Sequence, residues 1–118
     1  MTPFGKKLRE LRAKKNLNLK DMAQALKVSS AYLSALEHGW RSKPSSGLIQ
    51  QIAAYFNLVW DDVDELKKLA DLSDPKITIE TAGLIPQATE LANKLALKIG
   101  KLNLDQINQI LFILEEEK

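Results

Sequence analysis

The sequence predicts an all-α fold, with five helices in the first seventy residues and a helical hairpin at the end, preceded by a short extended segment. Apolar residues recur at intervals of three and four along most of the chain, and Asn, Ser, Gly and Pro separate these windows. Only Lys76 to Thr81 alternates apolar and polar residues, as a short strand or an extended arm does. We therefore expect a domain over 1–70, a linker or extended arm over 71–83, and the helical hairpin over 84–118.

Three helices are expected in the N-terminal third of the chain. The apolar residues over 4–15 have the spacing of an amphipathic helix. Asn18, with Asp21 three residues later, is typical of the N-cap of a short helix over 19–26. A third helix is expected over 30–38, begun by a serine cap and ended by a glycine.

Two further helices complete the first seventy residues. One is expected to begin at Ser45 or Ser46 and to carry inward apolar residues as far as Phe56. Asp61 is then the expected cap of a helix over 62–70. Its first turn is acidic and its later residues include lysines, which is the polarity that the helix dipole favours.

Two helices are expected in the C-terminal part. Pro86 suits the first turn of a helix over 86–100, which Gly100 would end. Asn103 can form a capping box at the start of a helix over 104–117. The acidic residues that follow are expected to form a solvated tail.

The last helix carries apolar residues over more of its circumference than one partner helix can cover. We expect the helix over 86–100 to cover one side and a second copy of the chain to cover the other. Packing against the N-terminal domain remains the alternative. The predicted dimerisation residues are Leu104, Ile107, Ile110, Leu111 and Leu114.

Charge is divided unevenly between the two halves of the chain. Residues 1–60 hold ten Lys/Arg and three Asp/Glu, a net charge of +7, whereas residues 61–118 hold seven and twelve, a net charge of −5. A basic half of this kind predicts contact with a polyanion such as nucleic acid. A solvated basic helix face is the alternative that charge alone leaves open.

Composition excludes several classes of function. The chain has no cysteine and one histidine, so thiol catalysis, cysteine-ligated zinc and a multi-histidine metal site are excluded. Nothing offers a nucleophile with a base or a phosphate-cradling glycine loop. We expect no enzyme activity, no cofactor and no metal. The sequence shows neither a membrane-length apolar run nor a signal peptide, so a cytoplasmic location is expected.

Two short helices joined by a tight turn over 18–39 form a helix-turn-helix pattern. Ala23 is small where the two helices would cross, and Val28 is apolar in the turn. Leu33 and Leu36 would anchor the second helix, so that its other face projects outward. Such a helix can enter the major groove of DNA while the first helix crosses the backbone.

The same window resembles the Cro/phage-repressor type of helix-turn-helix, the xenobiotic-response-element family of bacterial regulators. The resemblance lies in Ala23, in the Leu-x-Val-Ser pattern from Leu26, in Tyr-Leu-Ser from Tyr32, and in Glu-x-Gly from Glu37. It covers about residues 3–70. It implies a homodimeric transcriptional regulator, most simply a repressor, bound to a pseudo-palindromic operator in double-stranded DNA.

The resemblance also implies which residues contact DNA. Outward positions at the start of the third helix would reach base edges, whereas the start of the second helix and the loop after the third would approach phosphates. The DNA-binding residues expected in this way are Asn18, Lys20, Ser29, Ser30, Ala31, Tyr32, Ser34, Ala35, His38, Trp40, Arg41 and Lys43.

Some of these positions leave alternatives open. Leu19 stands where the family commonly has Gln, and the base-reading positions are mostly Ser and Ala. The protein therefore reads either thymine methyl groups and single hydroxyl bonds, or DNA shape with help from a loop arginine. Tyr32 contacts DNA or packs on the first helix. Trp40 is either a lid on the core or a contact to DNA or a partner, and Trp60 is expected in the core or an interface.

A second class of function is also compatible with the sequence. In it, the chain is an antitoxin or inhibitor whose C-terminal region binds a protein partner, while the helix-turn-helix regulates its own expression. A small toxic gene beside this one would favour that reading. An RNA-binding role is disfavoured because aromatic residues make up only 6% of the chain.

Overall fold

The structure, a computed structural model, describes residues 1–116. These residues form seven α-helices and one short 3₁₀ turn, without a β-strand, so the all-α prediction is confirmed. The chain divides into two compact units, unit 1 over Met1–Ile77 and unit 2 over Thr78–Lys118. Lys76 to Thr81 does not pair as a strand. Of the two predicted alternatives, a short strand and an extended arm, the extended arm therefore remains.

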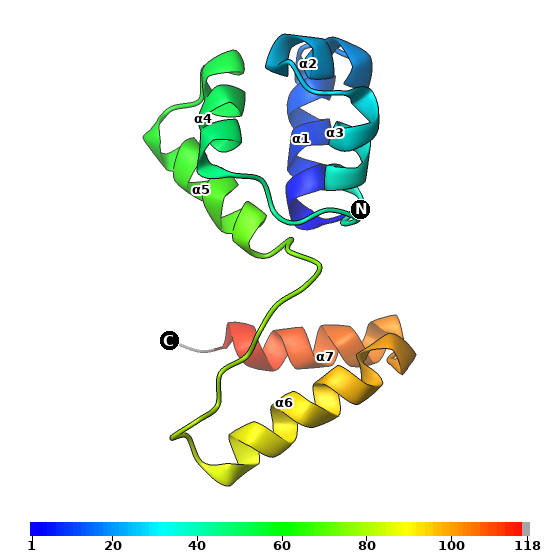
Figure 1. Cartoon of the computed structure of the whole chain (residues 1–118), viewed down its shortest axis with the longest axis vertical. Coiled ribbons are helices and arrows are strands. Elements are labelled where there is room, and N and C mark those ends of the chain that lie inside the picture. The colour runs from blue at the N-terminus through cyan, green and yellow to red at the C-terminus, as the bar shows by residue number, and fades with distance from the viewer. Residues whose placement is uncertain (117–118) are drawn as a thin grey trace. The chain divides into compact units, whose positions relative to one another are not determined.

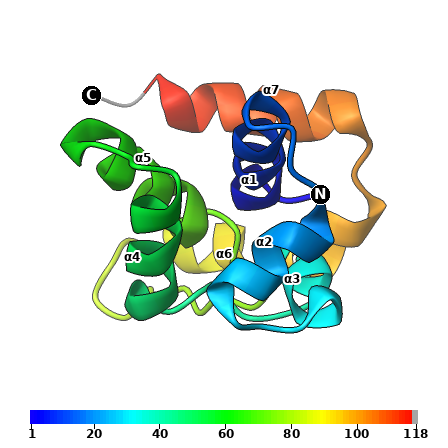
Figure 2. The ribbon, with the colours of Figure 1, turned by 90° about the horizontal axis from the view of Figure 1, so that it is seen from above.

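Unit 1 contains the first five helices (Figure 1). They are α1 (Pro3–Lys14), α2 (Leu19–Leu26), α3 (Ser30–Glu37), α4 (Ser46–Tyr55) and α5 (Trp60–Asp71). Helix α1 packs against α3 on one side and α5 on the other, as the view from above shows (Figure 2). Helix α2 packs against α3 and α4, and α4 packs against α5.

The predicted caps explain where most of these helices begin. Asn18 Oδ1 accepts a hydrogen bond from the backbone N–H of Asp21 at 2.7 Å, and Asp21 accepts one in return, so the cap of α2 is a complete capping box. The side chains of Ser29 and Ser45 cap α3 and α4 by accepting one backbone hydrogen bond each, without a capping box. The prediction for α5 was wrong: the helix begins at Trp60, one residue before Asp61, and Val59 precedes it without a side-chain cap.

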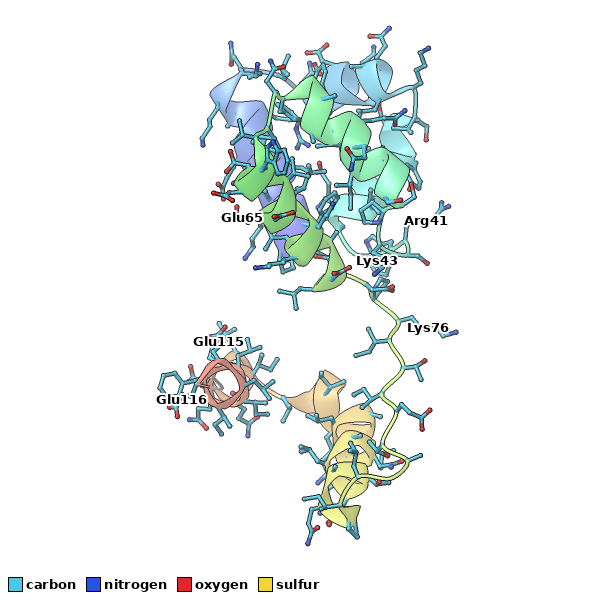
Figure 3. All side chains as sticks on the ribbon, turned by 90° about the vertical axis from the view of Figure 1, so that its left-hand side faces the viewer. Arg41, Lys43, Glu65, Lys76, Glu115 and Glu116 are labelled. Carbon is cyan, nitrogen blue, oxygen red and sulfur yellow. The ribbon has the colours of Figure 1, made fainter. Side chains whose placement is uncertain are left out.

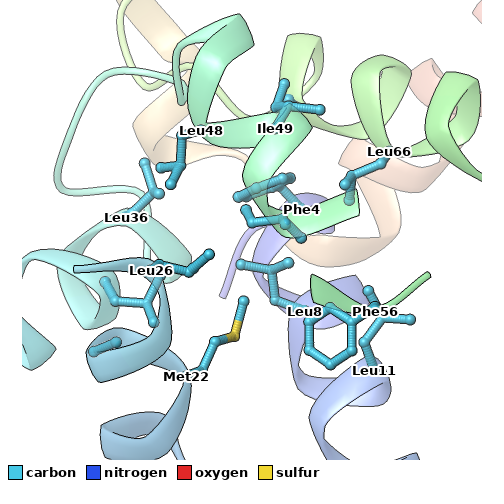
Figure 4. Close-up of a cluster of buried hydrophobic side chains, with 14 residues drawn as sticks. Phe4, Leu8, Leu11, Met22, Leu26, Leu36, Leu48, Ile49, Phe56 and Leu66 are labelled. Atoms are coloured by element: carbon cyan, nitrogen blue, oxygen red, sulfur yellow. The ribbon is translucent and has the colours of Figure 1, made fainter. Parts of the chain in front are cut away.

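One apolar core holds the five helices together (Figure 4). Every helix contributes side chains to it, because each has an apolar stripe at helical spacing. The core side chains are Phe4, Leu8, Leu11, Met22, Ala23, Leu26, Leu33, Leu36, Leu48, Ile49, Ile52, Phe56, Leu66 and Ala70. Each of the five helices places at least one fully inaccessible side chain in this core: Phe4 and Leu8, Met22, Leu33, Ile52 and Leu66.

Unit 2 consists of α6 (Pro86–Lys98), a 3₁₀ turn (Ile99–Lys101) and α7 (Leu104–Glu115). Helix α6 begins at its proline and α7 at a capping box formed by Asn103, as predicted. Gly100 does not end α6 as a left-handed cap, because the chain passes through the 3₁₀ turn instead. Residues 117–118 lie outside the described residues. They include the last residue of the predicted helix and the end of the expected acidic tail.

No described residue of unit 2 is buried. Helices α6 and α7 meet at the 3₁₀ turn and diverge from it, so neither covers the apolar face of the other (Figure 1). The expectation that α6 covers one side of α7 was therefore wrong. No described helix is long and apolar enough to cross a membrane.

Candidate nucleic-acid interface

Helix α3 is fixed on one side and accessible on the other. Leu33 and Leu36 are 0% and 3% exposed and anchor it in the core. Ser30 and Ala31 are exposed in its first turn, and the residues one turn later are partly exposed. The helix therefore presents a continuous outward face of small side chains, as the sequence predicted.

A buried ion pair fixes the far end of α3. Glu37, the last residue of the helix, receives hydrogen bonds from both terminal nitrogens of the Arg12 guanidinium on α1. Arg12 is 9% exposed and Glu37 is 2% exposed at the side chain. The Glu37 carbonyl oxygen also accepts hydrogen bonds from the N–H and hydroxyl of Thr2, at 3.0 and 3.1 Å.

The approach of α1 to this end of α3 depends on Gly5. A Cβ atom at that position would lie 2.2 Å from the Glu37 carbonyl oxygen, so any other residue would force the helices apart. Sequence analysis counted Arg12 only among the cations of the basic half of the chain and missed the pair. A carboxylate at position 37, on the inward face set by Leu33 and Leu36, was the available signal, because a buried charge requires a partner.

The turn between α2 and α3 has the expected construction. Ala23 is 2% exposed where the helices cross, and Val28 packs partly buried against the core. Lys27, at the end of α2, adopts the left-handed conformation with φ of 60° and leaves its side chain exposed. Lys27 was not predicted as a binding residue. Together with the exposed Lys20, it adds positive charge to the α2 side of the interface.

Tyr32 and Arg41 form a stacked pair beside α3. The guanidinium carbon of Arg41 lies 5.1 Å from the centre of the Tyr32 ring, within the range of a cation–π interaction. Tyr32 is partly buried and packs against the core, so part of its side chain is turned toward the domain. Arg41 itself is exposed on the loop after α3 (Figure 3).

Lys43 lies on the same loop but is already paired. Its Nζ is 2.8 Å from Oδ1 of Asp71, the last residue of α5. The hydrogen bond and the negative charge of Asp71 raise the pKa of Lys43 above its ordinary value. A phosphate would have to compete with this carboxylate for Lys43.

The remaining predicted residues are accessible. Asn18 is exposed but engaged as the cap of α2, and His38 Nδ1 lies 2.9 Å from the Ser34 carbonyl oxygen. Trp40 is 80% exposed, so its alternative as a lid on the core was wrong. Trp60 is 88% exposed, which removes the core alternative for it as well. Trp60 instead borders a groove between α4 and α5.

The described residues contain no group of three His, Asp or Glu side chains that could hold a metal ion. What the arrangement offers is a rigid helix with a small-residue face, flanked by exposed cations from two segments. These are Lys20 on α2, Lys27 directly after α2, and Arg41 after α3. Such a surface can bind a groove and the phosphates beside it.

Comparison with known proteins places this surface in a helix-turn-helix unit. The helix-turn-helix family profile matches residues 8–59. The chain is 38% identical over 81 residues to the HTH-type transcriptional regulator DdrOP3 of Deinococcus deserti, covering 69% of this chain and 57% of the relative. It is 35% identical over 63 residues to the uncharacterized HTH-type transcriptional regulator RghRB of Bacillus subtilis, covering 53% and 45%. The chain thus spans about half the length of these relatives. No solved structure matches it significantly.

Proposed function

We propose that this chain, which belongs to the Cro/phage-repressor-type helix-turn-helix family of transcriptional regulators, acts as a homodimeric repressor on a pseudo-palindromic DNA operator. In this proposal α3 lies in the major groove and α2 crosses the phosphate backbone. Occupying an operator that overlaps a promoter blocks RNA polymerase sterically, so the function requires no catalytic group.

The observation that carries the proposal is the one-sided anchoring of α3. Apolar residues and the Arg12–Glu37 pair fix the inner side and the end of the helix, while Ser30 and Ala31 stay exposed. A helix held this rigidly can enter a groove about 12 Å wide without first being ordered. The cations on α2 and after α3 are placed to bind the phosphates on either side.

The dimer in this proposal forms through unit 2. Leu104, Phe112, Ile113 and Leu114 on α7 are 62% to 70% exposed, and Leu111 is 46% exposed. Stable interfaces bury about 1,200–2,000 Å² in total, and a two-fold axis doubles every apolar contact that one copy offers. Binding of both copies of α3 to one operator requires them to reach major grooves one helical turn of DNA apart, about 34 Å.

The experiment is a titration followed by fluorescence anisotropy. DNA from the region upstream of the gene is compared with a scrambled duplex of the same composition, each at two salt concentrations. A dissociation constant of about 10⁻⁸ M or tighter on the upstream DNA, with much weaker binding to the scrambled duplex, is expected. Equal, weak binding to both that disappears with salt would contradict site-specific regulation.

The exposed apolar face of unit 2 also favours a second candidate function. An antitoxin or inhibitor would cover that face with a different protein and use the helix-turn-helix to regulate its own expression. Light scattering separates the two candidates. A dimer in the absence of DNA supports the homodimeric repressor, whereas a chain that stays monomeric at micromolar concentration favours a protein partner.

A further inference from the structure

We infer that α3 recognises an A·T-rich half-site, and that it does so chiefly through the methyl groups of thymine. This inference rests on the proposed DNA-binding function and names the bases that the same surface reads. It is carried by the chemistry of the outward face of α3 and by the positions of Glu37, Tyr32 and the neighbouring cations.

The outward face consists of two short ridges. Ser30 and Ser34 are one turn apart, and so are Ala31 and Ala35, so the two pairs lie side by side on the helix. This face offers hydroxyl and methyl groups. A side chain that binds guanine or adenine in bidentate fashion must be Arg, Lys, Asn or Gln, and α3 contains none of them.

The one charged residue of α3 is removed from the groove. Glu37 could accept a hydrogen bond from the amino group of cytosine, but its carboxylate is bound to Arg12 and is 2% exposed. A serine hydroxyl can donate to or accept from several bases and therefore discriminates poorly. Of the groups that α3 presents, the alanine methyl is the one with a distinctive partner, the thymine C5-methyl group.

Small side chains also set the distance at which this contact forms. Apolar groups must approach to about 4.0–4.5 Å to be in contact, so the helix backbone has to lie deep in the groove. No bulky side chain on the outward face prevents this approach. Tyr32 is the largest residue in the first two turns of α3, and it is packed partly into the core beneath Arg41.

The nearby cations occupy a different part of the surface. Lys20 belongs to α2, Lys27 directly follows α2, and Arg41 belongs to the loop after α3. Their long side chains suit phosphates at the edges of the groove. Their contribution is therefore affinity for any sequence, and discrimination between bases remains with α3.

The test begins with selection of duplexes from a random DNA library by the full chain. Each thymine of the enriched duplex is then replaced by deoxyuridine, which removes one methyl group and keeps every hydrogen-bonding group. Each contacted position is expected to weaken binding about fourfold, the equivalent of about 0.8 kcal/mol. Uracil at flanking positions is the control and should have no effect.

A double-mutant cycle assigns the methyl contacts to α3. In Ala31→Gly or Ala35→Gly, uracil at the contacted thymine should cause no further loss, because the partner methyl is already absent. Ala54→Gly, at an exposed helical position on α4, is the matched control and should leave the uracil effect intact. Comparing ratios of affinities makes the result independent of any loss of helix stability.

Four outcomes would overturn the inference. Enrichment of G·C-rich half-sites, or neutral uracil at every position, would leave the proposed function standing and remove the methyl contacts. A uracil effect that persists undiminished in both glycine variants would mean that other groups read the methyls. If no sequence is enriched although salt-dependent binding remains, the proposed site-specific function fails, and this inference fails with it.

Discussion

The buried pair between Arg12 and Glu37 is expected to be the ion pair of unit 1 most sensitive to substitution. Glu37→Gln removes the negative charge and leaves a guanidinium, 9% exposed, beside a neutral amide. Breaking a buried pair from one side costs about 3–5 kcal/mol. A domain the size of Met1–Ile77 has a free energy of unfolding of about 4–12 kcal/mol. The variant should therefore lose at least a quarter of that free energy, and at the lower end of the range it loses all of it and unfolds.

Urea unfolding followed by circular dichroism measures this loss, and the chain offers a matched control. Lys7 and Glu65 form a second ion pair between helices, at 3.1 Å, but Glu65 is 56% exposed. Glu65→Gln should cost no more than about 1 kcal/mol, since solvent screens an exposed pair. Replacing the buried pair by Arg12→Met with Glu37→Leu should restore most of the stability. Equal stability of Glu37→Gln and Glu65→Gln would refute the reasoning.

Five substitutions test the interface and the proposed dimer. Arg41→Ala should weaken binding to all sequences alike and reduce the slope of log affinity against log salt by about 0.9 for each phosphate that Arg41 neutralises; an unchanged slope would remove Arg41 from the interface. Asp71→Asn frees Lys43, so it should tighten binding to scrambled DNA in anisotropy, and adding Lys43→Ala should abolish that gain. Leu111→Asp should convert the dimer to a monomer in light scattering, and persistence of the dimer would place the interface elsewhere. Ser30→Ala should change the selected sequence more than the overall affinity, whereas a uniform loss would indicate a phosphate contact.

The helices of unit 1 could be predicted from the sequence because their signals are local. A cap such as Asn18 acts on a backbone N–H three residues away, and an apolar stripe repeats within one turn. The pair of Arg12 with Glu37 joins residues 25 positions apart, so no local pattern identifies either residue as the partner of the other. For the same reason, the core alternative was wrong for both Trp40 and Trp60. An apolar side chain indicates a preference for burial, but the sequence does not identify the surface that would bury it.

Unit 2 shows the same limit at the level of whole helices. The apolar pattern of α7 correctly predicted a helix begun by Asn103. The pattern also indicates that the face of α7 favours burial, but it cannot name the surface that buries it. Helix α6 was the nearest candidate in sequence, yet the 3₁₀ turn at Ile99–Lys101 directs the two helices apart. The direction of a helix after a turn depends on backbone torsions that composition does not fix.

The proposed readout makes dimerisation a condition of specificity as well as of affinity. Two alanine methyls at about fourfold each give one half-site a discrimination of about 16-fold, and two half-sites give about 250-fold. Site-specific regulators discriminate by about 10³-fold or more, so one half-site is far too little and even two need some help from the hydroxyl groups of α3. A Leu111→Asp monomer is therefore expected to discriminate operator from scrambled DNA by about the square root of the factor that the dimer shows. Equal discrimination by monomer and dimer, measured by anisotropy on the same two duplexes, would mean that specificity resides outside the paired α3 helices.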